Sequence, residues 1–415
     1  MDWIMELGVS LLKSSFILVG IYVALGCLLQ KKSWQVTISA VFKSAISLIL
    51  MSIGGGVIGE SLMSLGYLFQ RSFGLIGIIS SNERLAAYTE TRFGHIIYSV
   101  IIVGMIVNIV MAKKTKFKYI FLTGHQMIYM SCALTIGLSY VGIPIWGVVA
   151  IGGIVLGIMM SVFPSLIQPY TKEITGKENI AVGHFSTVGF FISAKIGEFV
   201  NRPEQKREKK MGSSLLVDNL LATAISMVLL FTLAAIIAGK TYVQDVTNTY
   251  YIVFAIKQGL YFATGVYIIL TGVRMMIGEI ITAFKGIAQK IVPDAIPALD
   301  CSILFPYRQD RMMIGFVFSM IGGIVAMFIA GSSSVYAIIP SSTICFFSGS
   351  AAGLYGHVKG GKLGAVVSSL IFGLSIGLLP LLLLPMMRES GFYKVALGEF
   401  DFNVVVMIIK GIFGK

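Results

Sequence analysis

The sequence predicts an all-α protein that crosses a membrane many times, and three observations support this fold class. Hydrophobic residues make up 56% of the chain and charged residues only 12%, about half the charged fraction of a soluble domain. Long stretches such as 97–112 and 313–330 contain no charged side chain. The basic residues behind the net charge of +13 gather in short linkers, as in membrane topologies rather than in nucleic-acid-binding proteins.

Eleven apolar stretches are predicted to be membrane spans, since a spanning helix needs about 20 apolar residues. The chain start lacks the basic segment of a cleaved signal peptide, so the first stretch is expected to be a retained helix. The predicted spans are residues 7–29, 36–62, 95–112, 119–140, 143–167, 214–238, 250–276, 312–331, 334–356, 364–386 and 402–413.

The basic linkers predict the orientation in a bacterial inner membrane. They lie at residues 31–32, 113–118, 202–210, 308–311 and 357–362. If all of them are cytoplasmic, the N-terminus lies outside and the C-terminus inside. This alternation requires segments 176–198 and 291–306 each to enter and leave on the cytoplasmic side.

Segments 176–198 and 291–306 are therefore predicted to be re-entrant hairpins. Glycines surround His184 in the first, and prolines precede Asp300 in the second. Broken backbone is tolerated at membrane depth only inside protein, which is how transporters build sites near the midplane. Interfacial helices are the alternative, but Pro and Gly disfavour them. One hairpin in each half is compatible with an inverted repeat divided near residue 212.

Three polar residues within apolar stretches are the main candidates for a binding site. An ionisable side chain in lipid costs about 2.5–3.5 kcal/mol, so His125, His184 and Asp300 are expected to face a hydrated cavity. An imidazole both donates and accepts, and a carboxylate accepts from neighbouring hydroxyls, which suits a carbohydrate. The alternatives are histidines bonded to helix carbonyls and an Asp300 that caps a half-helix.

No catalytic motif is present in the sequence, and no metal or cofactor is predicted. It contains no nucleotide-binding loop, no zinc-protease histidine pair and no nucleophile elbow. The cysteines are expected to be free and buried, because they lie in or beside apolar stretches without metal-ligand spacing. They are Cys27, Cys132, Cys301 and Cys345.

Several motifs occur in a fixed order along nearly the whole chain. They are Leu122-Thr123-Gly124-His125, Gly183-His184, Asp218-Asn219, Gly272-Val273-Arg274-Met275 with Glu279, Ile291-Val292-Pro293, Ala298-Leu299-Asp300-Cys301, Ile338-Ile339-Pro340 and Phe346-Phe347-Ser348. No single motif is decisive, but the ordered set resembles the membrane subunit (IIC) of the ascorbate-type sugar phosphotransferase system (PTS).

The resemblance implies a homodimer with a dimerising scaffold and a mobile core, which carries sugar inward by an elevator-like shift. It also implies a cytosolic IIB subunit that phosphorylates the sugar from a phosphocysteine charged by a IIA subunit. The loops of this chain are too short to fold as such domains. Residues 1–415 are therefore expected to form one permease unit without a phosphoryl-carrying residue, served by separate IIA and IIB polypeptides.

The resemblance also places the sugar contacts. The predicted contact residues are His125, Gln126, Tyr129, His184, Phe185, Asp300, Asn82 and Glu83. Ascorbate-type members carry glutamine where this chain has Tyr129 and Phe185. Losing two amides alters discrimination between sugars, and an aromatic ring can stack on a sugar's apolar face. Ascorbate, a pentose and a pentitol therefore stay open as substrates. An ion-coupled secondary transporter and a non-transporting receptor are the alternative functions.

Overall fold

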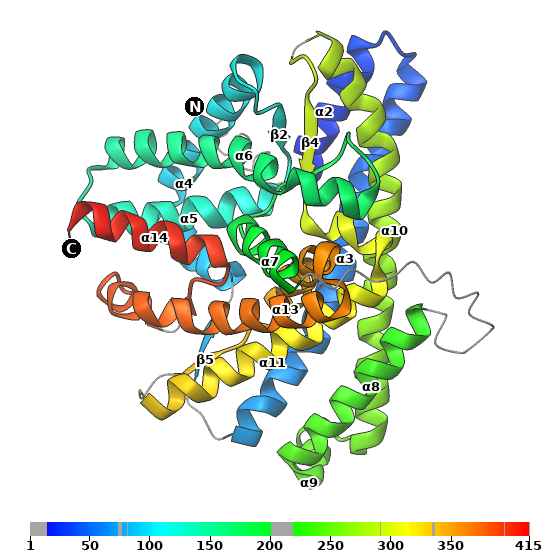
Figure 1. The fold of residues 1–415 in the computed structure, drawn as a ribbon, viewed down its shortest axis with the longest axis vertical. Coiled ribbons are helices and arrows are strands. Elements are labelled where there is room, and N and C mark those ends of the chain that lie inside the picture. The colour runs from blue at the N-terminus through cyan, green and yellow to red at the C-terminus, as the bar shows by residue number, and fades with distance from the viewer. Residues whose placement is uncertain are drawn as a thin grey trace.

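The computed structural model describes residues 15–73, 77–80, 82–200, 219–290, 292–333, 337–393 and 395–414, and it is dominated by helices (Figure 1). Within these residues, six helices are long and apolar enough to span a membrane, or seven if the bent pair α8 (Asn219–Ala238) and α9 (Lys240–Thr247) is one span. The predicted class, an all-α polytopic membrane protein, is confirmed. The count of eleven crossings stays a prediction.

The two halves of the chain have a similar order of helices and strands, although the second half contains additional short helices. The first half contains α2 (Ser15–Leu29), α3 (Trp34–Phe73), β1 (Gly77–Ser80), α4 (Asn82–Lys114), β2 (Tyr119–Phe121), α5 (Gly124–Tyr140), α6 (Ile145–Thr175), β3 (Ala181–Val182) and α7 (Thr187–Val200). The second contains α8, α9, α10 (Tyr251–Lys290), β4 (Ile296–Leu299), the 3-10 helix η1 (Cys301–Tyr307), α11 (Gln309–Ser333), β5 (Ala337–Ile339), α12 (Ser342–Ile344), the π-helix η2 (Cys345–Gly349), α13 (Ser350–Glu389), β6 (Val395–Ala396) and α14 (Phe400–Phe413).

A glycine explains why α13 appears as a single long helix. Gly361 has φ 59° and ψ −152°, which is not helical and which only glycine adopts readily. The chain therefore forms two helical segments that meet at Gly361, as the two predicted spans 334–356 and 364–386 require. The segment before Gly361 corresponds to α5 of the first half, and the segment after Gly361 corresponds to α6.

Two small parallel sheets, which were not predicted, connect the halves. Their strand orders are β5-β1-β6 and β2-β4-β3, so each central strand comes from one half and both outer strands from the other. The registers are equivalent. Ile79 pairs with Ile339 and Val395, and the corresponding residue Ala298 pairs with Phe121 and Ala181. Strand pairing gives hydrogen-bond partners to backbone that leaves the helices inside an apolar environment.

The helices form two groups (Figure 1). Helices α2, α3, α8 and α10 pack together in one group, and most of the remaining helices pack around α6 and α13 in the other. Small residues allow close approach within both groups. A Cβ on Gly54 of α3 would lie 2.7 Å from the carbonyl oxygen of Gly265 in α10. Gly373 of α13 lies directly against the carbonyl of Ser319 in α11.

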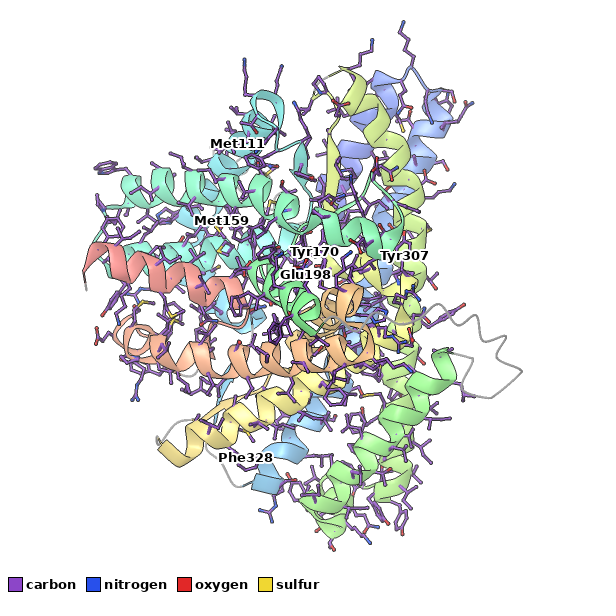
Figure 2. The ribbon with its side chains drawn as sticks, in the orientation of Figure 1. Met111, Met159, Tyr170, Glu198, Tyr307 and Phe328 are labelled. Atoms are coloured by element: carbon purple, nitrogen blue, oxygen red, sulfur yellow. The ribbon has the colours of Figure 1, made fainter. Side chains whose placement is uncertain are left out.

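Polar contacts join α7 and α13 to α6. The Tyr170 hydroxyl of α6 donates to Glu198 Oε1 of α7 at 2.7 Å, and the two labelled side chains lie together in Figure 2. Thr171 Oγ1 lies 2.8 Å from the Tyr355 hydroxyl of α13. The four cysteines are free and buried, as predicted.

Candidate functional site

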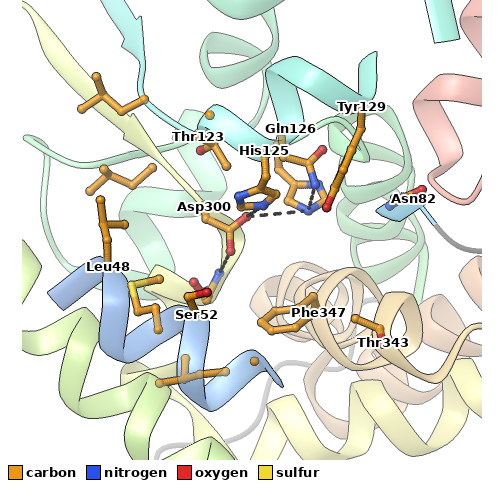
Figure 3. A pocket seen from close by; sticks show the side chains of 18 of the residues that line it. Leu48, Ser52, Asn82, Thr123, His125, Gln126, Tyr129, Asp300, Thr343 and Phe347 are labelled. Carbon is orange, nitrogen blue, oxygen red and sulfur yellow. Dashed lines mark hydrogen bonds and ion pairs between the residues drawn. The ribbon is translucent and has the colours of Figure 1, made fainter. Parts of the chain in front are cut away.

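Three strand ends bring the main predicted residues together. His125 lies in the first turn of α5 after β2, His184 follows β3, and Asp300 follows β4. Because the three strands are parallel neighbours in one sheet, they end at the same edge. Residues 175 positions apart, from 125 to 300, therefore meet, and Figure 3 shows the side chains of His125 and Asp300 facing each other across this edge.

Asp300 uses its two carboxylate oxygens differently. Its Oδ2 accepts from the Ser302 N–H at 3.3 Å and caps η1. Its Oδ1 lies 3.6 Å from His125 Nε2 and 3.8 Å from His184 Nε2. This buried Oδ1 accepts no hydrogen bond from the residues that the structure describes. A ligand hydroxyl placed here would supply the donor that a buried carboxylate oxygen needs.

The two histidines differ in their exposure. The His184 side chain is 2% exposed, its Nδ1 accepts from the Ser186 N–H at 3.1 Å, and the Gln126 side-chain amide lies 3.0 Å from its Nε2. Gln126 Oε1 in turn accepts from the Phe185 N–H at 3.2 Å. The His125 side chain is 48% exposed. His184 is therefore held in place, whereas His125 is accessible to a ligand.

A cavity of about 600 Å³ opens at this edge, and both helix groups line it (Figure 3). Leu48 and Ser52 of α3 form part of one wall, and the strand ends with His125, Asp300 and Tyr129 form part of another. The Tyr129 ring centre lies 5.8 Å from that of His125. A mainly apolar cavity of this size with a few convergent polar groups is typical of a small-molecule site.

Glu399, which the sequence did not single out, also lines the cavity. It is 3% exposed and accepts hydrogen bonds from Ser186 Oγ at 2.6 Å, Ser348 Oγ at 2.7 Å and Asn82 Nδ2 at 3.3 Å. It follows Gly398 just before the predicted span 402–413, as His184 follows Gly183. That similarity is the sequence signal that could have identified it.

The sequence matches the EIIC-GAT family, described as the PTS system sugar-specific permease component, over residues 10–401. The chain belongs to this permease family. A curated relative is the "Ascorbate-specific PTS system EIIC component" of Mycoplasma pneumoniae, 25% identical over 423 residues. The alignment covers 87% of this chain but 64% of the relative, so the chain spans less than two thirds of that protein. The resemblance inferred from the ordered motifs is confirmed.

Phe185 of this permease does not line the cavity, contrary to the expected stacking on a sugar. It is completely buried and stacks on Phe121, with ring centres 5.0 Å apart and planes at 20°. Phe163 packs against its edge at 6.1 Å. His184 and Phe185 lie in the connection between β3 and α7, where the His184 ring faces Asp300 and the Phe185 ring enters the aromatic core.

The predicted contact near Asn82 and Glu83 lies at another strand end. Asn82 follows β1 at the start of α4, is 5% exposed and lines the cavity. The side chain of Glu83 lies outside the described part of the chain. Asn82 thus lies just beyond the end of β1, whose sheet is equivalent to the one that precedes Asp300.

Donor atoms of His184, Asp300 and Cys301 lie within 4.8 Å of one another, which invites comparison with a metal site. A metal bound at His184 Nε2 would require the ring proton on Nδ1. That atom instead faces the Ser186 N–H at 3.1 Å, and the Gln126 amide occupies the side of Nε2. These residues are therefore poorly arranged to hold a metal.

Proposed function

We propose that this permease binds a small uncharged carbohydrate, such as a pentose or pentitol, in the cavity beside His125, His184 and Asp300. The single observation that supports this most is the buried Asp300 Oδ1, which accepts no hydrogen bond from the described residues and lies 3.6 Å from His125 Nε2 and 3.8 Å from His184 Nε2. A carboxylate accepts from a sugar hydroxyl, while the exposed His125 can donate to or accept from the next hydroxyl. Gln126, Tyr129 and Asn82 are the further contacts in this proposal.

The charge of the cavity favours an uncharged sugar over ascorbate, which is an anion at neutral pH. Among the described residues that line the cavity, Asp300 and Glu399 are acidic and none is lysine or arginine. A second anion would be repelled by these carboxylates in a site of low dielectric constant. The name of the Mycoplasma relative gives ascorbate as its substrate, so ascorbate is the comparison ligand.

The transport step that we propose is an elevator-like shift between the two helix groups. The cavity lies between α3 of one group and the strand ends of the other, so relative movement of the groups would carry the site. Helices α2, α3, α8 and α10 would form the scaffold of a homodimer in a bacterial inner membrane. The equivalent order and register of the two halves support an inverted repeat. Separate IIA and IIB polypeptides would supply the phosphoryl group.

Uptake into membrane vesicles tests this function. Vesicles loaded with phosphoenolpyruvate and the purified PTS proteins, including the cognate IIA and IIB, are given labelled pentitols, pentoses or ascorbate. We expect a phosphorylated pentose or pentitol to accumulate, to require the phosphoryl donor and to resist an uncoupler. Accumulation of free sugar that an uncoupler abolishes would instead indicate an ion-coupled transporter. Saturable binding without flux would indicate a receptor.

Variants of the permease test the site in the same preparation. Asp300→Asn and His125→Ala are each expected to weaken sugar binding about tenfold to hundredfold, because each removes a hydrogen bond that involves a charged partner. Asp294→Asn is the matched control, since Asp294 is exposed and its φ of 61° suits asparagine. Calorimetry on the folded protein measures all three, and unchanged affinity in Asp300→Asn would contradict the site.

A further inference from the structure

Glu399 lies where four chain segments meet. It precedes α14, and its hydrogen-bond donors come from the start of α4, the β3–α7 connection and η2. Both serine hydroxyls donate to Oε2, while the Asn82 amide donates to Oε1. Short hydrogen bonds to a carboxylate are stronger than those between neutral groups. The side chain therefore holds together segments that are as much as 317 residues apart.

The register of the two sheets shows how Glu399 comes to this place. Ala396 pairs with Ser80 as Val182 pairs with Leu299. Glu399 lies three residues after Ala396, and Phe185 lies three residues after Val182. The two equivalent positions have diverged, because the phenylalanine enters an aromatic cluster and the glutamate reaches across to the other half.

Helices α7 and α14 also cap each other around this point. Ser186 Oγ donates to Glu399 and accepts from the Phe400 N–H at 3.2 Å. Asp401 accepts from the Val188 N–H of α7 at 3.1 Å. Free amides at helix N-termini need such acceptors. Glu399 is thus part of a reciprocal junction between the halves.

Each donor to Glu399 is linked to a wall of the cavity. The backbone N–H of Ser186 donates to His184 Nδ1, so the serine that binds Glu399 also orients the imidazole beside Asp300. Ser348 follows Phe347, which lines the cavity, and Asn82 lines it directly. A glutamine offers one acceptor oxygen where three donors converge. The carboxylate therefore fixes three walls of the cavity before a ligand arrives.

We propose that Glu399 is a positioning residue for sugar binding, which preorganises the cavity by joining Asn82, Ser186 and Ser348. The proposal rests on the proposed function and extends it to a residue outside the cluster of His125, His184 and Asp300. Preorganised walls raise affinity because less ordering remains to be done on binding. Glu399 acts on His184 through Ser186. The effects of substituting Glu399 and Ser186 on ligand affinity are therefore expected to be coupled.

A double-mutant cycle on sugar affinity tests this coupling in the purified full-length protein. The labelled pentitol or pentose that the wild-type protein binds best is the probe. Glu399→Gln and Ser186→Ala are each expected to weaken binding about tenfold. The double variant is expected to lose no more affinity than the single variant with the larger loss. Uptake at saturating sugar should change little. Glu389→Gln is the matched control, because Glu389 accepts from Tyr140 at 2.8 Å at an exposed site.

A merely structural Glu399 gives a different outcome. Its substitution would lower the unfolding temperature and leave the affinity of the folded fraction unchanged. That result, or strictly additive losses in the cycle, overturns the proposal. If Glu399→Gln does not fold, Ser186→Ala and Ser348→Ala each remove one of the two serine hydrogen bonds to Glu399. Each is then expected to weaken binding, and unchanged affinity in both also overturns the proposal.

Hydrogen exchange separates this proposal from the proposed function, since it needs no ligand. Glu399→Gln should speed exchange in peptides covering 181–190 and 343–350 together, and leave 145–155 unchanged. Faster exchange in only one of the two segments, or in neither, counts against Glu399 joining them, whatever the protein binds. If both segments respond but the wild-type protein binds no carbohydrate, the proposed function fails while the junction role of Glu399 stands.

Discussion

At the scale of single residues, the site depends on how each carboxylate oxygen is satisfied. Asp300 Oδ2 caps η1 and so fixes the side chain, which leaves Oδ1 toward the histidines without a hydrogen-bond donor from the described part of the chain. Glu399 is the opposite case, since three donors occupy it. A satisfied carboxylate organises structure, whereas an unsatisfied one favours a ligand. The two acids of the cavity therefore have different roles.

Tyr129 and Phe185, which both stand where ascorbate-type members carry glutamine, should respond differently to that substitution. Tyr129→Gln changes a cavity wall, so we expect altered relative affinities for ascorbate and pentitols. Phe185→Gln places an amide among Phe121 and Phe163, so we expect a stability loss of about 3 kcal/mol or more. Phe199→Gln is the control, since Phe199 is 91% exposed. Calorimetry and thermal unfolding measure the effects, and a stable Phe185→Gln protein with higher ascorbate affinity would contradict the assignment.

The sequence could identify His125, His184 and Asp300 because ionisable side chains within apolar stretches are costly and therefore rare. It could not identify the junction at Glu399. Ser186 and Glu399 are 213 residues apart, and serine is too common in membrane helices to attract notice. Phe185 is predicted as a contact because ascorbate-type members carry glutamine at that position, and the sequence does not show that its ring packs against Phe121 and Phe163 instead.

At the scale of elements, the short strands decide where the polar residues lie. β2, β3 and β4 contain two to four residues, and Pro297 lies within β4. Such short apolar runs have no periodicity that separates strand from helix. The sequence therefore predicted breaks at 176–198 and 291–306 but not their pairing. The broken segments are strand-to-helix connections, and the pairing is what aligns their ends.

Glycines at helix contacts provide a test at this scale. Gly373→Ala would push a Cβ into the carbonyl of Ser319, and such overpacking costs about 1–3 kcal/mol. Gly56→Ala in α3 meets no atom within 4 Å, and it should stabilise the helix by about 1 kcal/mol. The same substitution is thus expected to lower the unfolding temperature in α13 and to preserve or raise it in α3. Equal effects at both sites would argue against the close α11–α13 contact.

At the scale of the whole molecule, the halves cannot form their sheets independently. Each sheet takes its central strand from one half and its outer strands from the other. The pairing aligns Asp300 with residues of the first half, and it aligns Asn82 with residues of the second. The cavity between His125, Asp300, Asn82 and Glu399 is therefore a product of both halves together. No local sequence pattern indicates this exchange of strands. The similar lengths of corresponding elements in the two halves are compatible with it.

The inverted repeat makes a prediction about the two membrane faces. Asn179 and Tyr393 are both exposed, and each lies two residues before the third strand of its half. If the halves are inverted, these equivalent positions lie on opposite sides of the membrane. The basic linkers predict that Asn179 is cytoplasmic and Tyr393 external.

Asn179→Cys should therefore react with an impermeant maleimide only in inside-out vesicles, and Tyr393→Cys only in intact cells. The wild-type protein is the control, because its four cysteines are buried. Labelling of both variants from the same face would exclude the inverted arrangement and, with it, the alternation that gives eleven crossings.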